Sequence, residues 1–115
     1  MKTREPVEVQ CDPSVGVEPR KTRTCVVVSN DIANRYGQAL TVVPTQTYTA
    51  ERVARAYVVD LRKPRSTLAD ARAANASMIM TYDRGRVVAR AGRVSADTQR
   101  ALDRALSIHL GLARI

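Results

Sequence analysis

The sequence predicts a mainly β domain with some α structure: a small, partly open β-barrel of about five to seven strands with a C-terminal helix. Its apolar runs are short and rich in valine, which is typical of strands. Apolar residues recur at helical spacing most clearly in one segment near the end of the chain. The 115 residues contain no internal repeat and no linker, so we expect one domain over residues 1–115.

Valine and strand-ending residues mark most of the expected strands. Residues 7–11 alternate apolar and polar side chains, which indicates a strand with one buried face. Residues 25–29 form an apolar run, as in a central strand that is buried on both faces. Residues 39–43 form the next strand, which ends at Pro44. Further strands are expected over residues 56–61, 76–81 and 86–90.

Both expected helices begin after a residue whose side chain can cap backbone N–H groups. Asn30 precedes a short helical turn over residues 32–36, and Gly37 ends it. Ser95 begins a longer helix that continues to residue 110.

The longer helix has an apolar stripe, which we expect to pack on the barrel. His109 falls beside this stripe, so we expect a partly buried, structural histidine. The stripe contains Ala101, Leu102, Ala105, Leu106 and Leu110.

The charge balance indicates a polyanionic partner. The net charge is +8, the isoelectric point is about 10.3, and 16 of the 19 cationic residues are arginine. The planar guanidinium suits phosphate, so nucleic acid is the expected partner. A basic surface produced by codon bias is the alternative.

The residues that are absent narrow the chemistry. A single histidine excludes acid–base catalysis by two imidazoles of one chain and a histidine-rich metal site. The glycines are isolated, so there is no phosphate-binding loop, and neither a metal nor another cofactor is expected. No apolar stretch follows the basic N-terminal residues, so we expect no secretory signal, and no apolar run approaches the ~20 residues that span a bilayer. We therefore expect a cytoplasmic protein without membrane contact.

Three segments occur in an order that resembles a known family. Residues 12–18 are similar to an Asp-Pro-Thr-x-Gly-x-Glu loop. Arg23 and the segment 25–35 resemble an arginine followed by a valine-rich strand and Asn-Asp-x-x-Asn, and residues 81–86 resemble Thr-Ile-Asp-Lys-x-Arg. Together they cover almost the whole chain and are similar to the MazF/PemK family of toxin endoribonucleases.

This resemblance implies a fold, an activity and partners. The fold is an SH3-like barrel, and the protein is a homodimer. The activity is sequence-specific, metal-independent cleavage of single-stranded RNA, in particular mRNA, which arrests translation and growth. The implied partner is a MazE-like antitoxin whose C-terminal tail covers the RNA groove.

Cleavage without a metal uses the 2′-hydroxyl of the substrate as the nucleophile and leaves a 2′,3′-cyclic phosphate and a 5′-hydroxyl. Arg23 matches the catalytic arginine of the family, and a guanidinium there can stabilise the phosphorane. A loop arginine that neutralises nearby carboxylates is the alternative. Glu18 matches the glutamate of the first loop, where it orients Arg23, contacts a base or accepts the 2′ proton.

A threonine of the family motif has no direct counterpart in this chain. An ungapped match places Gln46 there, between Thr45 and Thr47. A small shift of the strand end brings Thr47 into the site, so we expect Thr47 to fill the role with the Gln46 amide assisting. Polar residues that merely close a strand are the alternative.

Recognition of RNA also departs from the family pattern, because Ser77 and Met78 replace its Asp-Gln pair. Basic and aromatic residues are expected to compensate by stacking and phosphate contact, or else belong to the barrel and its surface. These candidate RNA-binding residues are Arg20, Lys21, Tyr48, Tyr82, Arg84 and Arg86.

Two other functions stay open. The first is a DNA gyrase poison on the same barrel, although the chain lacks the C-terminal Trp-Gly-Ile on which such toxins depend. The second is a degenerate family member that binds RNA, or acts as a repressor with its antitoxin, without cleaving RNA.

Overall fold

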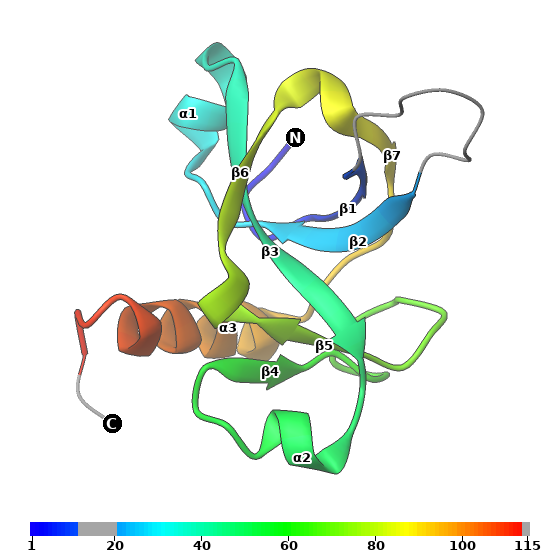
Figure 1. The fold of residues 1–115 in the computed structure, drawn as a ribbon, viewed down its shortest axis with the longest axis vertical. Coiled ribbons are helices and arrows are strands. Elements are labelled where there is room, and N and C mark those ends of the chain that lie inside the picture. Colours follow the sequence, from blue (N-terminus) through cyan, green and yellow to red (C-terminus); the bar gives the residue numbers. More distant parts are fainter. Residues whose placement is uncertain (12–20, 114–115) are drawn as a thin grey trace.

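The computed structural model describes residues 1–11 and 21–113, whose strands form one curled antiparallel sheet (Figure 1). The sheet order is β4-β5-β3-β2-β1-β7, and β6 pairs with β3 beside this path. No pairing joins the two end strands of the described chain, so the barrel stays partly open and the expected fold is confirmed. The strands are β1 (Pro6–Gln10), β2 (Thr22–Val27), β3 (Ala39–Thr47), β4 (Val58–Asp60), β5 (Arg72–Asn75), β6 (Met80–Asp83) and β7 (Val87–Arg90).

Three helices and two 3₁₀ turns connect or cover the strands. The Asn30 side chain accepts a hydrogen bond from the Ala33 N–H, and the Ser95 side chain accepts one from the Thr98 N–H, so both expected helix starts are confirmed. The helices are α1 (Asp31–Tyr36), α2 (Ala50–Val53) and α3 (Ala96–His109), and the 3₁₀ turns are η1 (Ala76–Met78) and η2 (Arg84–Arg86).

Several expected strand boundaries are wrong, and the strand expected over residues 25–29 covers Thr22–Val27. β3 does not end at Pro44, because it pairs with β2 up to that residue and with β5 from Thr45 onward. The missing proline N–H thus falls where the strand changes partners. The strand expected over residues 76–81 is a 3₁₀ turn followed by β6, since the Asn75 side chain accepts from the Ser77 N–H and starts the turn.

The helix α3 packs on one face of the sheet through a narrower stripe than expected. Leu102, Ala105 and Leu106 are buried in a cluster with residues of β2, β3 and β5, whereas Leu110 is 53% exposed. The expected partial burial of His109 is wrong, because the last turn of α3 projects past the strands (Figure 1) and leaves this side chain exposed.

The opposite face of β1, β2 and β3 encloses a second apolar cluster inside the barrel. Since side chains alternate along a strand, one strand supplies both clusters: Val26 faces α3, and its neighbours Cys25 and Val27 face the barrel interior. All three are fully buried, as expected for a central strand. The second cluster consists of Val7, Val9, Cys25, Val27, Leu40 and Val42.

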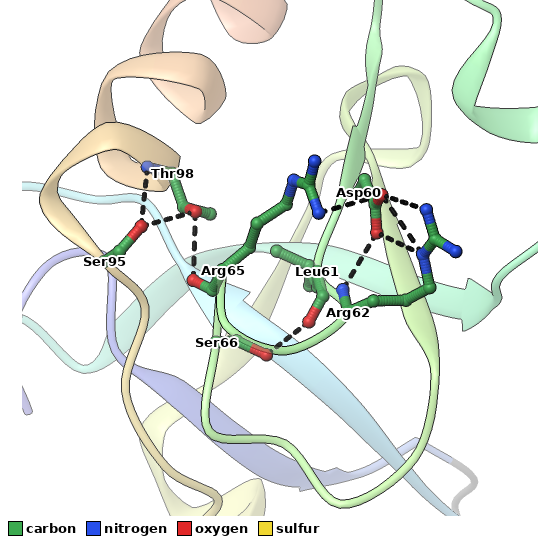
Figure 2. Close-up of polar contacts among 7 residues, drawn as sticks. All are labelled: Asp60, Leu61, Arg62, Arg65, Ser66, Ser95 and Thr98. Carbon is green, nitrogen blue, oxygen red and sulfur yellow. Dashed lines mark hydrogen bonds and ion pairs between the residues drawn. The ribbon is translucent and has the colours of Figure 1, made fainter.

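Polar contacts tie the segment after β4 to the start of α3 (Figure 2). Arg62 and Arg65 both pair with the Asp60 carboxylate, at 2.9 and 3.5 Å. The Thr98 hydroxyl donates to the Arg65 carbonyl at 2.9 Å, and the Ser66 hydroxyl donates to the Leu61 carbonyl at 2.5 Å. The hydrogen bond from Arg62 holds the pKa of Asp60 below its usual value.

We expect Asp60→Asn to lower the free energy of unfolding at pH 7. The lowered pKa means that the carboxylate stabilises the fold above the unfolded-state pKa, and that this contribution disappears as the pH falls through the folded-state pKa. The difference between wild type and variant, measured by urea unfolding, should therefore shrink below about pH 4. Asp70→Asn, at an exposed carboxylate, is the control. A difference that is constant with pH would contradict the role of the charge.

Candidate functional site

The face of the sheet turned away from α3 carries the residue that sequence reasoning ranks first. Val26 of β2 packs toward α3, so Arg23, three residues away, points to the other face. Arg23 also lies opposite Val9, a residue of the interior cluster. It is half-buried, and no hydrogen bond or ion pair joins its guanidinium to another described residue. Arg23 therefore lies at the edge of the barrel interior, and its positive charge is not paired with another described residue.

Gln46 lies on the same face as Arg23. Cys25 pairs with Pro44, so the positions two residues before and after them, Arg23 and Gln46, share a face of β2 and β3. The two strands are still adjacent here, because the Thr45 hydroxyl donates to the Thr24 carbonyl at 2.7 Å. Gln46 therefore follows the end of this pairing on the face that carries Arg23.

Thr45 and Thr47 point to the other face of β3. Thr45 is 1% exposed and accepts a hydrogen bond from Arg72 Nε at 3.0 Å. The Thr47 side chain is exposed, and its carbonyl accepts from Arg52 Nη1 at 2.7 Å. Neither threonine side chain is brought to the face that carries Arg23.

Behind the site, a chain of hydrogen bonds links the four strands β1, β2, β3 and β5. The Thr24 hydroxyl donates to Glu8 Oε1 at 2.6 Å, and Arg72 also donates through Nη2 to the Thr45 carbonyl at 3.0 Å. Glu8, Thr24 and Arg72 border a hollow of about 390 Å³ that Arg23 also lines. The charged and hydroxyl residues around this hollow are Glu8, Thr22, Arg23, Thr24, Asp70, Arg72 and Arg90.

A larger hollow of about 710 Å³ lies between β4 and α3, beside Asp60 and Arg104. It contains none of the residues for which the sequence indicates catalysis or RNA contact. The smaller hollow is the one that Arg23 lines, together with Thr24 and Arg72.

Tyr82 lies at the rim of the barrel interior, within electrostatic reach of Arg23. Burial and a hydrogen bond with Cys11 raise the pKa of the Tyr82 hydroxyl to about 12, and the Arg23 charge acts in the opposite direction. The hydroxyl donates to the Met80 sulfur at 3.1 Å. The ring is half-buried, so it offers part of one face for stacking.

Two of the other candidate RNA-binding residues, Arg84 and Arg86, belong to η2. Arg84 Nε and Arg86 Nη1 each donate to a backbone carbonyl at 3.2 Å, of Gly37 and Gln10 respectively, so both hold the η2 segment in place. Lys21 is exposed.

Tyr48 stacks with Arg62, whose guanidinium carbon lies 3.7 Å from the ring centroid. Tyr48 follows Gln46 by two residues on β3 and its extension, so the stacked pair belongs to the same side of the strand. Glu18 and Arg20 lie outside the described residues.

Sequence reasoning missed the contribution of β5. Arg72 holds Thr45, and Asn75 Nδ2 donates to Gln46 Oε1 at 3.2 Å. Arg62, the stacking partner of Tyr48, was also missed. The segment Arg72–Asn75 contains two alanines and no β-branched residue, so nothing in its pattern indicated a strand beside the site.

Within residues 1–11 and 21–113, no three His, Cys, Asp or Glu side chains come together as a possible metal site. In the same residues, no helix is long and apolar enough to cross a membrane.

A half-buried arginine and a glutamine thus share one face of the open barrel. Residues 3–110 match the family described as PemK-like, MazF-like toxins of type II toxin–antitoxin systems. The chain belongs to this family. It is 35% identical to Endoribonuclease MazF9 of Mycobacterium tuberculosis (strain ATCC 25618 / H37Rv), over 97% of this chain and 98% of that protein.

Solved structures share the fold at lower identity. A mycobacterial endoribonuclease in complex with its cognate antitoxin has a TM-score of 0.78 at 18% identity, over 100% of this chain and 99% of that one. MazF-mt6 of M. tuberculosis has a TM-score of 0.77 at 17% identity, with 96% and 100% covered. The MazE–MazF structure (Form-II) from Deinococcus radiodurans has a TM-score of 0.78 at 18% identity, with 98% and 97% covered.

We expect the two cysteines to differ in reactivity. Burial raises the pKa of the Cys25 thiol to about 12 and leaves it 0% exposed, so at pH 8 it is protonated and shielded. Cys11 is only half-buried. Iodoacetamide followed by peptide mass spectrometry should label Cys11 first, and urea should remove the difference. Cys11→Ser is the control, and rapid labelling of Cys25 in the folded protein would contradict the burial.

Proposed function

We propose that this chain, a MazF-like toxin endoribonuclease of a toxin–antitoxin system, cuts single-stranded messenger RNA at a short sequence without a metal ion. Such cleavage arrests translation and growth. The observation that carries the proposal is the placement of Arg23 and Gln46 on the face turned away from α3, where Arg23 has no partner among the described residues.

The proposed reaction is an internal transesterification. The 2′-oxygen forms a bond to phosphorus and loses its proton, while the bond from phosphorus to the 5′-oxygen breaks and that oxygen gains a proton. The products are a 2′,3′-cyclic phosphate and a 5′-hydroxyl. Because the nucleophile is already part of the substrate, the protein mainly orients it and neutralises the charge of the phosphorane.

Arg23 is the residue best suited to that charge. Its guanidinium can donate to two phosphate oxygens, and the paired strands β1 and β2 fix its backbone. Since a guanidinium is a poor acid at neutral pH, its role is electrostatic.

Gln46 is the better candidate for the second contact, because it shares the face of Arg23. Its amide donates to a phosphate oxygen but supplies no hydroxyl. Thr47, with its side chain on the other face, reaches the substrate only if the end of β3 turns. We also propose a catalytic role for Glu18. The candidate RNA contacts are Arg20, Lys21, Tyr48, Tyr82, Arg84 and Arg86.

The proposed partners follow from the solved relatives. One mycobacterial endoribonuclease is a complex with its cognate antitoxin, and the D. radiodurans protein is a complex of MazE and MazF. We extend this to the present chain: a homodimer whose RNA groove is covered by the C-terminal tail of a MazE-like antitoxin. Its place of action is the cytoplasm, where messenger RNA is found.

Arg23→Ala should lower the rate of RNA cleavage by about 10²–10³, the usual effect of losing one transition-state donor. The assay uses mixed single-stranded RNA with EDTA and maps new 5′-hydroxyl ends. Arg100→Ala removes an exposed arginine of α3 and should cleave normally. RNA that is bound but left intact by the wild type would indicate a degenerate binder. Full activity of Arg23→Ala would remove this residue from the site.

Gln46→Ala and Thr47→Ala separate the two candidates on β3. Loss of a donor that acts in the transition state lowers kcat with little effect on KM. We expect a fall in kcat of about 10-fold or more for Gln46→Ala and less than about 3-fold for Thr47→Ala. The reverse order in the same RNA assay would assign the role to Thr47.

A further inference from the structure

Asn75, at the end of β5, has its amide oriented by the turn that follows it. Its Oδ1 accepts from the Ser77 N–H at 3.0 Å and from the Ser77 hydroxyl at 2.5 Å. A backbone N–H can only donate, so the oxygen of Asn75 must face Ser77. The Nδ2 group therefore points the other way, toward β3.

This orientation determines how Gln46 lies. Gln46 pairs with Ala73, and Asn75 is two residues further along β5 on the same face. Asn75 Nδ2 donates to Gln46 Oε1 at 3.2 Å. Because an amide nitrogen cannot accept this hydrogen bond, the Gln46 oxygen is turned toward Asn75 and its NH₂ group is left for another partner.

We propose that Asn75 is a positioning residue that presents the Gln46 NH₂ group, and not its oxygen, to the scissile phosphate. The inference rests on the function proposed above. A phosphate oxygen accepts hydrogen bonds, and it accepts more strongly as the phosphorane gains charge. An inverted amide would place a carbonyl oxygen against that charge. The direction of the Gln46 amide thus decides whether this residue helps or hinders the reaction.

The direction of the Gln46 amide can be reversed by replacing the side-chain nitrogen of Asn75 with oxygen. In Asn75→Asp, the introduced carboxylate still accepts from Ser77, but its second oxygen can only accept at pH 7. It draws the Gln46 NH₂ group inward and turns the Gln46 oxygen toward the phosphate. We expect kcat to fall by about 10²-fold, with KM for the RNA changed much less. In Asn75→Ala the Gln46 amide turns freely between its two orientations. Only the fraction of molecules that presents the Gln46 oxygen loses activity, so kcat should fall only about twofold.

Lowering the pH should restore the cleavage activity of the Asn75→Asp variant. A protonated carboxyl group has one O–H donor, which can bond to Gln46 Oε1 while the other oxygen accepts from Ser77. Its activity relative to wild type at the same pH should therefore rise as the pH falls from 7 toward about 4–5, where a carboxyl group begins to gain its proton. Asn75→Ala should show no such rise, since it has nothing to protonate.

Controls separate positioning from folding and from the change in net charge. Asn30→Asp adds the same charge at the start of α1, where the carboxylate can still cap the helix, and should cleave normally. Urea unfolding of each variant checks that the fold persists. Equal losses for Asn75→Asp and Asn75→Ala at every pH would overturn the inference and leave Asn75 a structural residue. Cleavage at the wild-type rate by Asn75→Asp would overturn it as well.

The two proposals fail in different ways. If wild-type protein produces no new 5′-hydroxyl ends, the function itself is wrong. If wild type cleaves and Arg23→Ala does not, but Asn75→Asp matches Asn75→Ala, only the positioning role is wrong.

Discussion

The long strand β3 changes partners at Pro44, and both the shape of the barrel and the place of the site depend on this change. Before Pro44 the strand pairs with β2 and β6, and after it the strand pairs with β5. A proline has no N–H to pair, so the sheet can bend there without losing a donor. The residues directly after the bend are then held by side chains of β5 as well as by its backbone.

The side chains on the two faces of the sheet at this bend make different contacts. On the face toward α3, hydrogen bonds join Thr24, Thr45 and Arg72. The Thr45 hydroxyl donates to the Thr24 carbonyl and accepts from Arg72 Nε. On the other face lie Arg23 and Gln46, the two residues that we propose contact the substrate. The hydrogen-bonded residues on the α3 side make this part of the sheet rigid. Arg23 and Gln46 can therefore keep their geometry when a charged phosphate binds, because little reorganisation is required.

The valine-rich strands and both helix starts could be predicted, because their signals are local. The strand β5 could not, since two alanines between an arginine and an asparagine carry no strand preference. For the same reason Arg72 and Asn75 were absent from the predicted site. The face of Gln46 was also beyond prediction: it depends on the pairing of Cys25 with Pro44, and a shift of one residue would have exposed Thr45 or Thr47 instead.

In the described chain, β4, β6 and β7 each pair with one strand only, so each leaves an edge that could recruit a strand from another molecule. β4 is three residues long and β6 and β7 are four each, so each edge offers little backbone for such pairing. β4 ends at Asp60 with two arginines beside it, and β7 ends at the exposed Arg90. Short edges that finish in charge protect the protein against aggregation through its own sheet, even though the barrel never closes.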